Sequence, residues 1–299
     1  MMDSPPIAAL PFLGAGLACS GRIVEDIFDS VSRIDFVEVI VEHYLDAHPA
    51  RTAELLRLSA RYPIVCHGVD MSVGTAEPLD EIALRRKAQV VVESKALWFS
   101  DHLCFTKAHG IDIGQLTPLP FSDESIEIVT NNVRAIKACI PVPFLLENIA
   151  YYFTIPGSTM SEAEFIRRVV ESADCGLLLD LTNLYTNAIN HGYDPFAFLR
   201  SIPLERVVEI HVAGGSWMES VLIDSHSAEV PAPAWDLLDF VVRRSAVKGV
   251  VLERDENIPS LEELSRELEI ARRVMASRND APVPDHARSV GSADAGASD

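Results

Sequence analysis

PFLLENI (residues 143–149), MSEAEFIRRVVESA (160–173) and CGLLLDL (175–181) follow one another along the chain and decide the fold. The first and third stretches are short and apolar, as buried β-strands are, whereas the middle stretch has apolar residues at helical spacing. Ser161, followed three residues later by Glu164, is the pattern of a capping box at a helix start. A strand, a helix and a second strand in this order predict a βαβ unit with parallel strands.

The same alternation runs through the rest of the chain. The other expected strands are FLGAGLA (12–18), FVEVIV (36–41), PIVCHGV (63–69), WFSDHLCF (98–105), RVVEIHVAG (206–214) and GVVLERD (249–255). The stretches between them are expected to be helices, apart from residues 182–193 and the loops after the strands 98–105 and 206–214. Eight strand–helix units predict one α/β domain over residues 1–278, a closed TIM-type (β/α)8 barrel. An open, doubly wound sheet is the alternative.

Composition limits the classes of function. A formal net charge of −19 argues against binding to a nucleic acid backbone, which requires clustered Lys and Arg. No apolar run is long enough to span a membrane, and the N-terminus lacks a secretory signal. The five scattered cysteines indicate a reduced, cytoplasmic protein. The polar tail 279–299, which contains His286, is expected to be disordered.

Side chains that bind metals recur at the carboxyl ends of the expected strands, where the catalytic residues of such barrels lie. Of the nine histidines, four lie at or just past a strand end. The strand-end residues are Glu42, His43, His67, Asp101, His102, Glu147, Asn148, Asp180, Asn183, His211, Glu253, Arg254 and Asp255, and the loop after the seventh strand adds Asp224 and His226.

Each of these residues alone has an ordinary structural explanation. A single histidine can be a hydrogen-bonded core residue, Glu253 can pair with Arg254, and the segment around His191 can be a loop before a helix capped by Asp194. Together, however, imidazoles and carboxylates that converge on one opening are the donors that Zn, Fe, Ni and Cu sites use. The sequence therefore predicts a metal site with more than one ion.

The chain resembles the DUF692 (UPF0276) family, the multinuclear non-heme iron-dependent oxidative enzymes. The resemblance covers about Leu13 to Met275 and rests on seven blocks in the same order. They are HGVDMSVG (67–74), SDHLCF (100–105), LLENI (145–149), LLDLTNLYTNAINHGYDP (178–195), EIHVAGG (209–215), LIDSHSAEVP (222–231) and LERDENIP (252–259).

The resemblance implies two or three iron ions and dioxygen as co-substrate. It implies oxidation of a ribosomally made precursor peptide, often at cysteine, and a small partner protein that presents the leader peptide. The metal ligands that it implies are His67, His102, Glu147, Asp180, Asn183, His191, His211, Asp224, His226 and Glu253. Among them, Glu147, Asp180 and Glu253 are expected to be the catalytic carboxylates that bridge or fix the ions.

The chain departs from the common family pattern at three places. Gly215 stands where many members have histidine, Ser227 where many have aspartate, and Glu42-His43-Tyr44 replaces an ENY-like turn. These changes leave the number of ions open. Two other classes of function also remain at this stage, a Zn- or Mn-dependent hydrolase or sugar isomerase on a similar barrel, and a non-catalytic relative that binds peptides.

Overall fold

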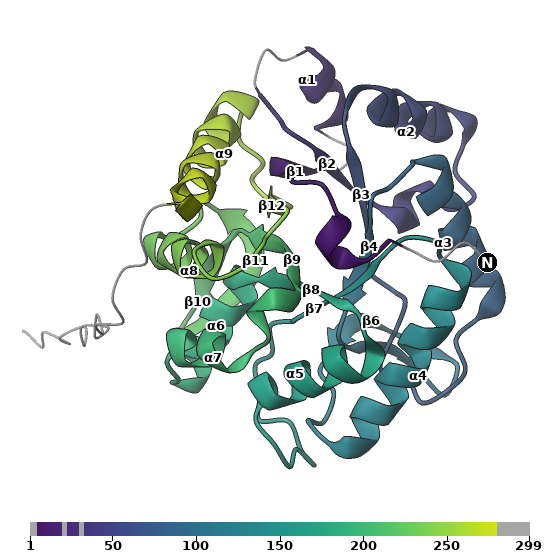
Figure 1. Ribbon diagram of the computed structural model, residues 1–299, viewed down its shortest axis with the longest axis vertical. Helices are drawn as coiled ribbons and strands as arrows, with labels where there is room; N and C mark the ends of the chain where they lie inside the picture. The colour runs from purple at the N-terminus through teal and green to yellow at the C-terminus, as the bar shows by residue number, and fades with distance from the viewer. Residues whose placement is uncertain (1–4, 20–22, 30–32, 280–299) are drawn as a thin grey trace, which may run out of the picture.

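The computed structural model describes residues 5–19, 23–29 and 33–279. Within these residues, eight parallel strands close into a barrel in the order β1-β12-β9-β8-β7-β4-β3-β2 (Figure 1). The strands are β1 (Gly14–Cys19), β2 (Val37–Ile40), β3 (Ile64–Gly68), β4 (Phe99–His102), β7 (Phe144–Glu147), β8 (Gly176–Asp180), β9 (Val207–Val212) and β12 (Gly249–Leu252). The prediction of a closed (β/α)8 barrel is confirmed, and the open sheet is wrong.

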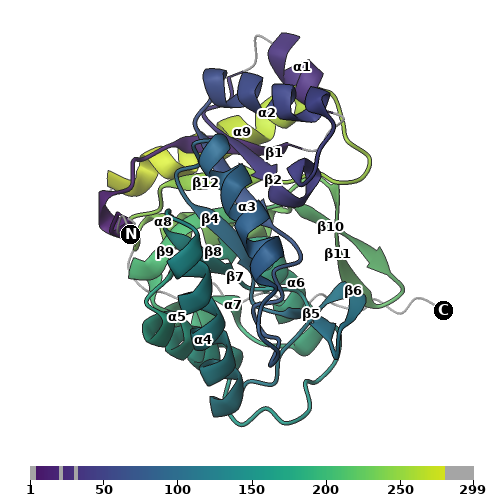
Figure 2. The same cartoon turned by 90° about the vertical axis from the view of Figure 1, so that its right-hand side faces the viewer.

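Helices surround the barrel, as Figures 1 and 2 show. They are α1 (Val24–Asp29), α2 (Pro49–Arg61), α3 (Glu81–Glu93), α4 (Asp123–Cys139), α5 (Glu162–Ala173), α6 (Leu181–His191), α7 (Pro195–Ser201), α8 (Ala232–Val242) and α9 (Leu261–Ala276). Short 3-10 turns are η1 (Ile7–Ala9), η2 (Val41–Tyr44), η3 (Leu204–Arg206) and η4 (Ser277–Asn279). The Ser161 side chain accepts the Glu164 backbone N–H at 3.2 Å, and Asp194 caps α7 with Pro195 at its first turn, as the sequence predicts.

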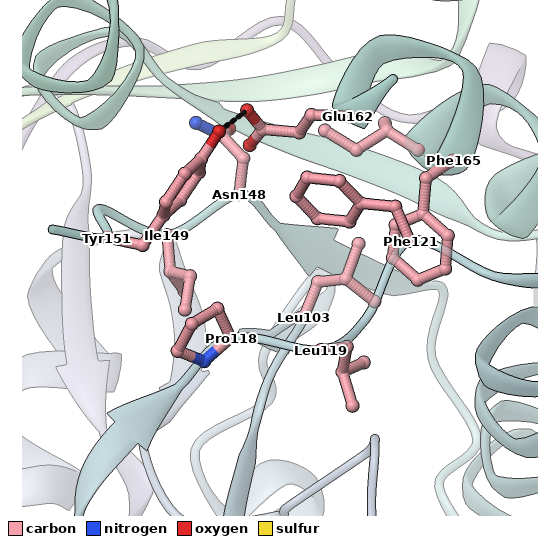
Figure 3. Close-up of a pocket in the computed structure, with 10 residues that line it drawn as sticks. Leu103, Pro118, Leu119, Phe121, Asn148, Ile149, Tyr151, Glu162 and Phe165 are labelled. Atoms are coloured by element: carbon pink, nitrogen blue, oxygen red, sulfur yellow. Dashed lines mark hydrogen bonds between the residues drawn. The ribbon is translucent and has the colours of Figure 1, made fainter. Parts of the chain in front are cut away.

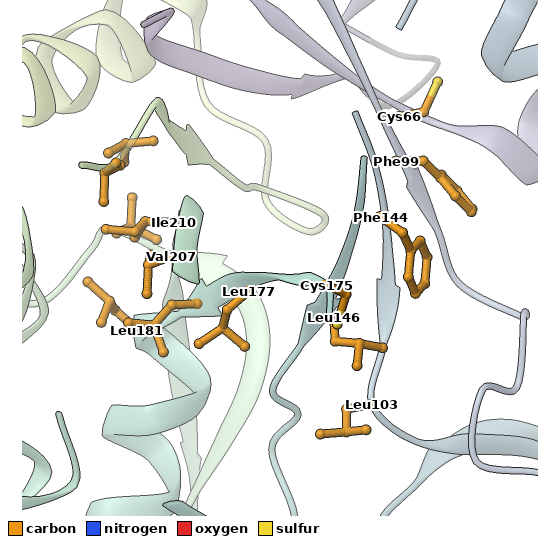
Figure 4. Packing of buried hydrophobic residues seen from close by; sticks show 14 of the residues in the cluster. Cys66, Phe99, Leu103, Phe144, Leu146, Cys175, Leu177, Leu181, Val207 and Ile210 are labelled. Atoms are coloured by element: carbon orange, nitrogen blue, oxygen red, sulfur yellow. The ribbon is translucent and has the colours of Figure 1, made fainter. Parts of the chain in front are cut away.

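Two apolar layers hold the barrel together. The larger one lies between the outer faces of the strands and the helices and includes Phe99, Phe144 and Ile210 (Figure 4). Burying each such side chain contributes roughly 1.5–3 kcal/mol. The smaller layer fills the barrel interior with Leu10, Phe36, Val65, Trp98, Leu145, Leu178, Val208 and Val251. The barrel is therefore a packed core at this level and not a pore.

Two segments expected to be loops form β-hairpins instead. The first consists of β5 (Phe105–Ala108) and β6 (Ile111–Thr117), and the second of β10 (Gly214–Met218) and β11 (Val221–Ala228). Figure 2 shows both hairpins on the same side of the molecule. Residues of β6 and β11 line one cavity, so the hairpins extend the opening of the barrel.

Helix α6 is a second correction, because the sequence reasoning gave residues 182–193 no helix. Asp180 caps it, since its side chain accepts the Asn183 backbone N–H at 2.7 Å. The predicted disordered tail lies outside the described residues from position 280 onward, His286 included. All five cysteines are unpaired, four of them buried. Among the described residues, none of the helices combines the length and apolar character that crossing a membrane requires.

Candidate metal centre

Polar side chains form the next interior layer, toward the carboxyl ends of the strands. Side chains on one face of a strand recur at every second residue, so each polar residue follows an apolar interior residue by two positions. The pairs are Phe36 and Glu38, Val65 and His67, Trp98 and Ser100, Leu145 and Glu147, Leu178 and Asp180, and Val251 and Glu253. Every polar member of these pairs is at most 8% exposed.

Glu147, at the end of β7, lies at the centre of this layer. Its Oε2 is 3.3 Å from His67 Nε2 and 3.3 Å from His102 Nε2, and its Oε1 is 3.4 Å from His211 Nδ1. These histidines come from β3, β4 and β9, strands that are separated in the sequence and belong to the same closed barrel. His67, His102 and Glu147 each offer a ligand atom within 4.8 Å of the others, so together they could hold one metal ion.

A second set of potential ligands comes from β9, from the end of β12 and from the hairpin β10–β11. His211 Nδ1 is 3.0 Å from Glu253 Oε2, and His226 Nε2 is 2.8 Å from Asp224 Oδ1. Three further groups have the spacing of metal ligands: Glu147, Asp180 and His211; Asp180, His226 and Glu253; and Glu38, His211 and Glu253. Since neighbouring groups share Glu147, Asp180, His211 or Glu253, the arrangement suits adjacent ions better than separate ones.

Many of these buried atoms have no hydrogen-bond partner, which is costly for a protein interior. Asp224 Oδ1 and His226 Nε2 are 2.8 Å apart, yet neither forms a hydrogen bond. The other atoms without a partner include Glu147 Oε2, Asp180 Oδ2, Asn183 Oδ1, His211 Nδ1 and Glu253 Oε2. These donor types suit transition-metal ions, and bound ions would satisfy the orphaned atoms. The residues present therefore fit a metal centre.

Two of the histidines are held by the ring nitrogen that faces away from the centre. The Ser100 hydroxyl donates to the Cys66 carbonyl at 3.3 Å, so its oxygen accepts from His67 Nδ1 at 2.8 Å. His226 Nδ1 lies 2.9 Å from Asp255 Oδ2. Each contact places the ring proton on the outer nitrogen and directs the lone pair of the other nitrogen inward.

The protonation of His67 and Glu147 favours ligation, whereas His211 and His226 must each lose a proton to bind a metal: burial alone would lower their pKa, but Glu253 and other nearby carboxylates raise it. Burial lowers the pKa of His67 to about 3, so its imidazole is neutral at physiological pH. Burial alone would raise the pKa of Glu147, but His102, His211 and His67 around it lower that pKa to about 2. Neutral imidazole next to ionised carboxylate is the state in which both side chains bind metals.

A cavity of ≈ 400 Å³ leads from the surface to the polar layer. Its wall includes His67, His102, Glu147, Asn183, Asp224, His226 and Glu253, together with Tyr152 and residues of β6. A second, much smaller cavity of ≈ 20 Å³ is lined by Tyr151 and Glu162, where the Tyr151 hydroxyl donates to Glu162 at 3.1 Å (Figure 3). Of these two cavities, the larger one has room for part of a substrate together with metal ions.

Two of the predicted ligands occupy different positions from the rest. Asn183 lies beside the centre, with its Oδ1 free and its Nδ2 donating to the Asn148 carbonyl at 3.1 Å. His191 is at the end of α6, where its ring stacks on Tyr151 and its Nε2 lies 2.9 Å from the Tyr151 carbonyl. Neither His191 nor Asp224 belongs to any of the four candidate ligand groups found among the described residues, although Asp224 lies against His226 of one group. Arg254 pairs with Glu267 at 2.7 Å and not with Glu253, so Glu253 keeps a free carboxylate.

Sequence reasoning missed three buried polar residues of the interior, namely Glu38, Ser100 and Glu209. The Glu209 carboxylate accepts a hydrogen bond from Trp98 Nε1 at 2.7 Å. The sequence contained a signal for Glu38 and Glu209, because an acidic residue within an otherwise apolar strand is unusual. In β9, the alternation of side chains also places Glu209 on the same face as His211.

Gly215 is enclosed by the second hairpin. A Cβ atom at this position would lie 2.4 Å from the Ile223 carbonyl oxygen on β11, so no larger residue fits without moving that strand. Ser227 Oγ lies 2.7 Å from Ser225 Oγ, which donates to Ser216 Oγ at 2.9 Å. A serine cluster therefore stands beside Asp224 and His226, and position 215 carries no side chain.

Gly215→Ala is expected to destabilise the protein by about 1–3 kcal/mol, the usual cost of forcing atoms into a filled site. Displacement of β11 would also move His226, so the number of bound metal ions per chain should fall. Thermal denaturation and elemental analysis measure the two effects. Ser216→Ala, at the neighbouring exposed position, serves as control and should stay within about 0.5 kcal/mol of wild type. Equal stability of the two variants would contradict the steric account.

Comparison with solved structures identifies similar barrels. The crystal structure of D-psicose 3-epimerase in the presence of D-fructose aligns with 89% of this chain and 98% of that chain, with a TM-score of 0.54 and 13% identity. Endonuclease IV from Thermus thermophilus aligns with 89% of this chain and 100% of that chain, with a TM-score of 0.54 and 17% identity. At such low identity, these matches show the fold alone.

Curated proteins give nearer relatives. A UPF0276 protein of Nitrosospira multiformis is 41% identical over 236 residues, which are 79% of this chain and 83% of that protein. A UPF0276 protein of Caulobacter vibrioides is 36% identical over 265 residues, 88% of this chain and 94% of that protein. The family model "RiPP precursor modification enzyme MbnB/TglH/ChrH" matches residues 14–276, where RiPP denotes a ribosomally synthesised and post-translationally modified peptide. The whole barrel, with every buried donor described above, thus lies within the match, and the chain belongs to this family of RiPP precursor modification enzymes.

Proposed function

We propose that this protein is a multinuclear non-heme iron enzyme that uses dioxygen to oxidise a ribosomally made precursor peptide at cysteine. The observation that carries the proposal is the set of overlapping donor groups at the base of the ≈ 400 Å³ cavity. Membership of a family that modifies RiPP precursors supports the choice of substrate.

The buried charges support more than one ion. Five carboxylates in the barrel interior are at most 8% exposed: Glu38, Glu147, Asp180, Glu209 and Glu253. Among the described residues, the ion pairs made by Glu38, Glu147 and Glu253 are all with histidines. Burial raises the pKa of Glu38, Asp180 and Glu209, which disfavours their charged form in the absence of a cation. Two or three divalent cations would favour the ionised carboxylates.

Imidazole and carboxylate donors suit iron, and Glu147 and Asp180 each belong to two of the donor groups that would hold it. Iron held there would supply activation of dioxygen and binding of a cysteine side chain as its thiolate. Ser100 and Asp255 keep His67 and His226 in the tautomers that ligation requires. Ile40, Val69 and Leu116 give the cavity an apolar wall that a peptide segment could contact.

The cavity accepts a short part of a peptide, since sites of this volume accommodate ligands the size of a small molecule. The rest of a precursor therefore needs another binding surface. We propose that a small leader-peptide-binding protein supplies it and presents the cysteine-containing segment to the cavity. Gln115 and Leu116 on β6 and Ser225 on β11 also line this cavity, so the segment would lie against both hairpins.

The test combines metal analysis with mass spectrometry. Protein reconstituted anaerobically with Fe2+ should hold two or three ions per chain. Co-expression with a cysteine-containing precursor and its leader-binding protein should change the peptide mass only when oxygen is supplied. Activity with Zn2+ or Mn2+ in the absence of oxygen would instead indicate a hydrolase or isomerase. Tight peptide binding without any change of mass would indicate a non-catalytic relative.

A further inference from the structure

Glu38 is a carboxylate in the middle of β2, flanked by Val37 and Val39 and completely buried in the barrel interior. Its Oε2 lies 3.1 Å from His211 Nε2, in hydrogen-bond geometry. Its Oε1 has no hydrogen-bond partner among the described residues. A charged side chain is rarely kept in such a place without a specific partner, so the contact with His211 is the feature to explain.

The two nitrogens of His211 face different surroundings. Nε2 faces Glu38, whereas Nδ1 lies 3.0 Å from Glu253 Oε2 and 3.4 Å from Glu147 Oε1. Nδ1 has no hydrogen-bond partner, although two carboxylates lie close to it. A hydrogen bond from Nε2–H to Glu38 leaves the lone pair on Nδ1, directed at the carboxylates that would share an ion with it.

We propose that Glu38 is a positioning residue, which fixes the tautomer and orientation of His211 so that Nδ1 binds metal. This inference rests on the metal-binding part of the proposed function and not on the identity of the metal or the peptide. A carboxylate that accepts the outer N–H of a histidine ligand also increases the basicity of the ligating nitrogen. Glu38 thus raises the affinity of the centre without touching an ion.

Glu209 is a matched control within the same barrel. It is also completely buried, and it lies on β9 two residues before His211. Its Oε2 accepts a hydrogen bond from Trp98 Nε1, and no histidine is among its described hydrogen-bond partners. Replacing either glutamate removes one buried carboxyl group, so a difference between the variants reports the contact with His211.

The experiment measures Zn2+ binding to the full chain, with zinc alone as the probe. Glu38→Ala is expected to bind zinc about 10–100-fold more weakly than wild type, as is usual when the partner of a histidine ligand is lost. Glu38→Gln keeps an oxygen that can accept from Nε2, so it should recover most of that loss. Glu209→Gln should stay within about threefold of wild type, because it leaves the histidine ligands unchanged.

Nitrogen NMR of ¹⁵N-histidine in the zinc-loaded protein provides a readout that a merely structural role would not change. Wild type and Glu209→Gln should show His211 protonated at Nε2 and metal-bound at Nδ1, and Glu38→Ala should lose this pattern. Equal zinc affinities for Glu38→Ala and Glu209→Gln would overturn the proposal. So would the loss of one whole ion per chain in Glu38→Gln, since that would make Glu38 a ligand. Failure of the iron or peptide chemistry would leave these results unaffected.

Discussion

Replacing Glu147 by glutamine is expected to abolish metal loading and peptide modification together. Glu147 is 2% exposed and lies within 3.4 Å of three histidines, so the variant loses the charge and a ligand oxygen at the point where the donor groups meet. Loss of a residue that only supports a ligand costs about 10–100-fold in metal affinity, so loss of a shared ligand should cost more than about 100-fold. The rate of peptide modification should fall by about 1,000-fold or more, which corresponds to roughly 4 kcal/mol.

Iron content and the mass of the co-expressed peptide measure the effect. Glu162→Gln is a suitable control, because Glu162 lies beside the small cavity and can still accept from the Tyr151 hydroxyl as glutamine. The control should keep its iron and its activity. A Glu147→Gln protein that retains full iron content and modifies the peptide would exclude Glu147 as a ligand and weaken the proposed function.

The second large effect is a loss of stability when Lys87, a buried lysine on α3, is replaced. Lys87 on α3 is 2% exposed and pairs with Glu42 and, at 2.5 Å, with Asp70. Burial raises the pKa of Glu42 and of Asp101, whereas Lys87 acts on both to lower it. Lys87 is therefore a cation that compensates the partly buried Glu42 and the fully buried Asp101, the residue before His102.

Lys87→Met should destabilise the protein by about 3–5 kcal/mol at neutral pH, because removing one partner leaves buried carboxylates uncompensated. Without Lys87 the folded-state pKa values of Glu42 and Asp101 rise further above their unfolded values. The two carboxyl groups can then stay buried without penalty only below about pH 4, where both are protonated. The stability of the variant falls as the pH rises and these groups ionise. The difference from wild type should accordingly shrink in acid, as urea denaturation at several pH values would show.

Lys107→Met is the control, since Lys107 is 41% exposed at the side chain and lies 3.7 Å from Asp70. An exposed pair of this kind contributes about 0–1 kcal/mol. If both lysine variants lost the same stability, burial of Lys87 would not be the cause.

The barrel could be predicted because its strands are apolar and its helices have clear periodicity, as in the segment from Pro143 to Leu181. The hairpins were missed because polar residues and glycines interrupt the alternation of their apolar residues, as in Gly114-Gln115 and Asp224-Ser225. The dipeptide His109-Gly110 was a sequence signal for the first hairpin, because glycine is favoured in two-residue hairpin turns. In the structure both residues have positive φ, 52° and 72°, as such a turn requires. Helix α6 was missed because its Thr and Asn residues are poor helix formers, and its packing and the Asp180 cap compensate.

The candidate site was predictable where residue type and strand end coincide, as for His67, Glu147 and Glu253. It was not predictable where the role depends on a neighbour from another strand. Glu38 contacts His211 across 173 positions of sequence, and Ser100 meets His67 through the register of β3 and β4. A single sequence contains the alternation of side chains but not which strands face each other across the barrel.

The interior layer has a consequence for folding. Its proposed metal ligands lie in or directly after six of the eight barrel strands, from His67 in β3 to Glu253 after β12. Ions bound there would be a cross-link that joins most strands of the closed barrel at one point. Such a cross-link can form only after all of these strands have come together, because a partly folded chain presents too few ligands. Metal uptake would then report completion of the barrel, and loaded protein would unfold as one unit.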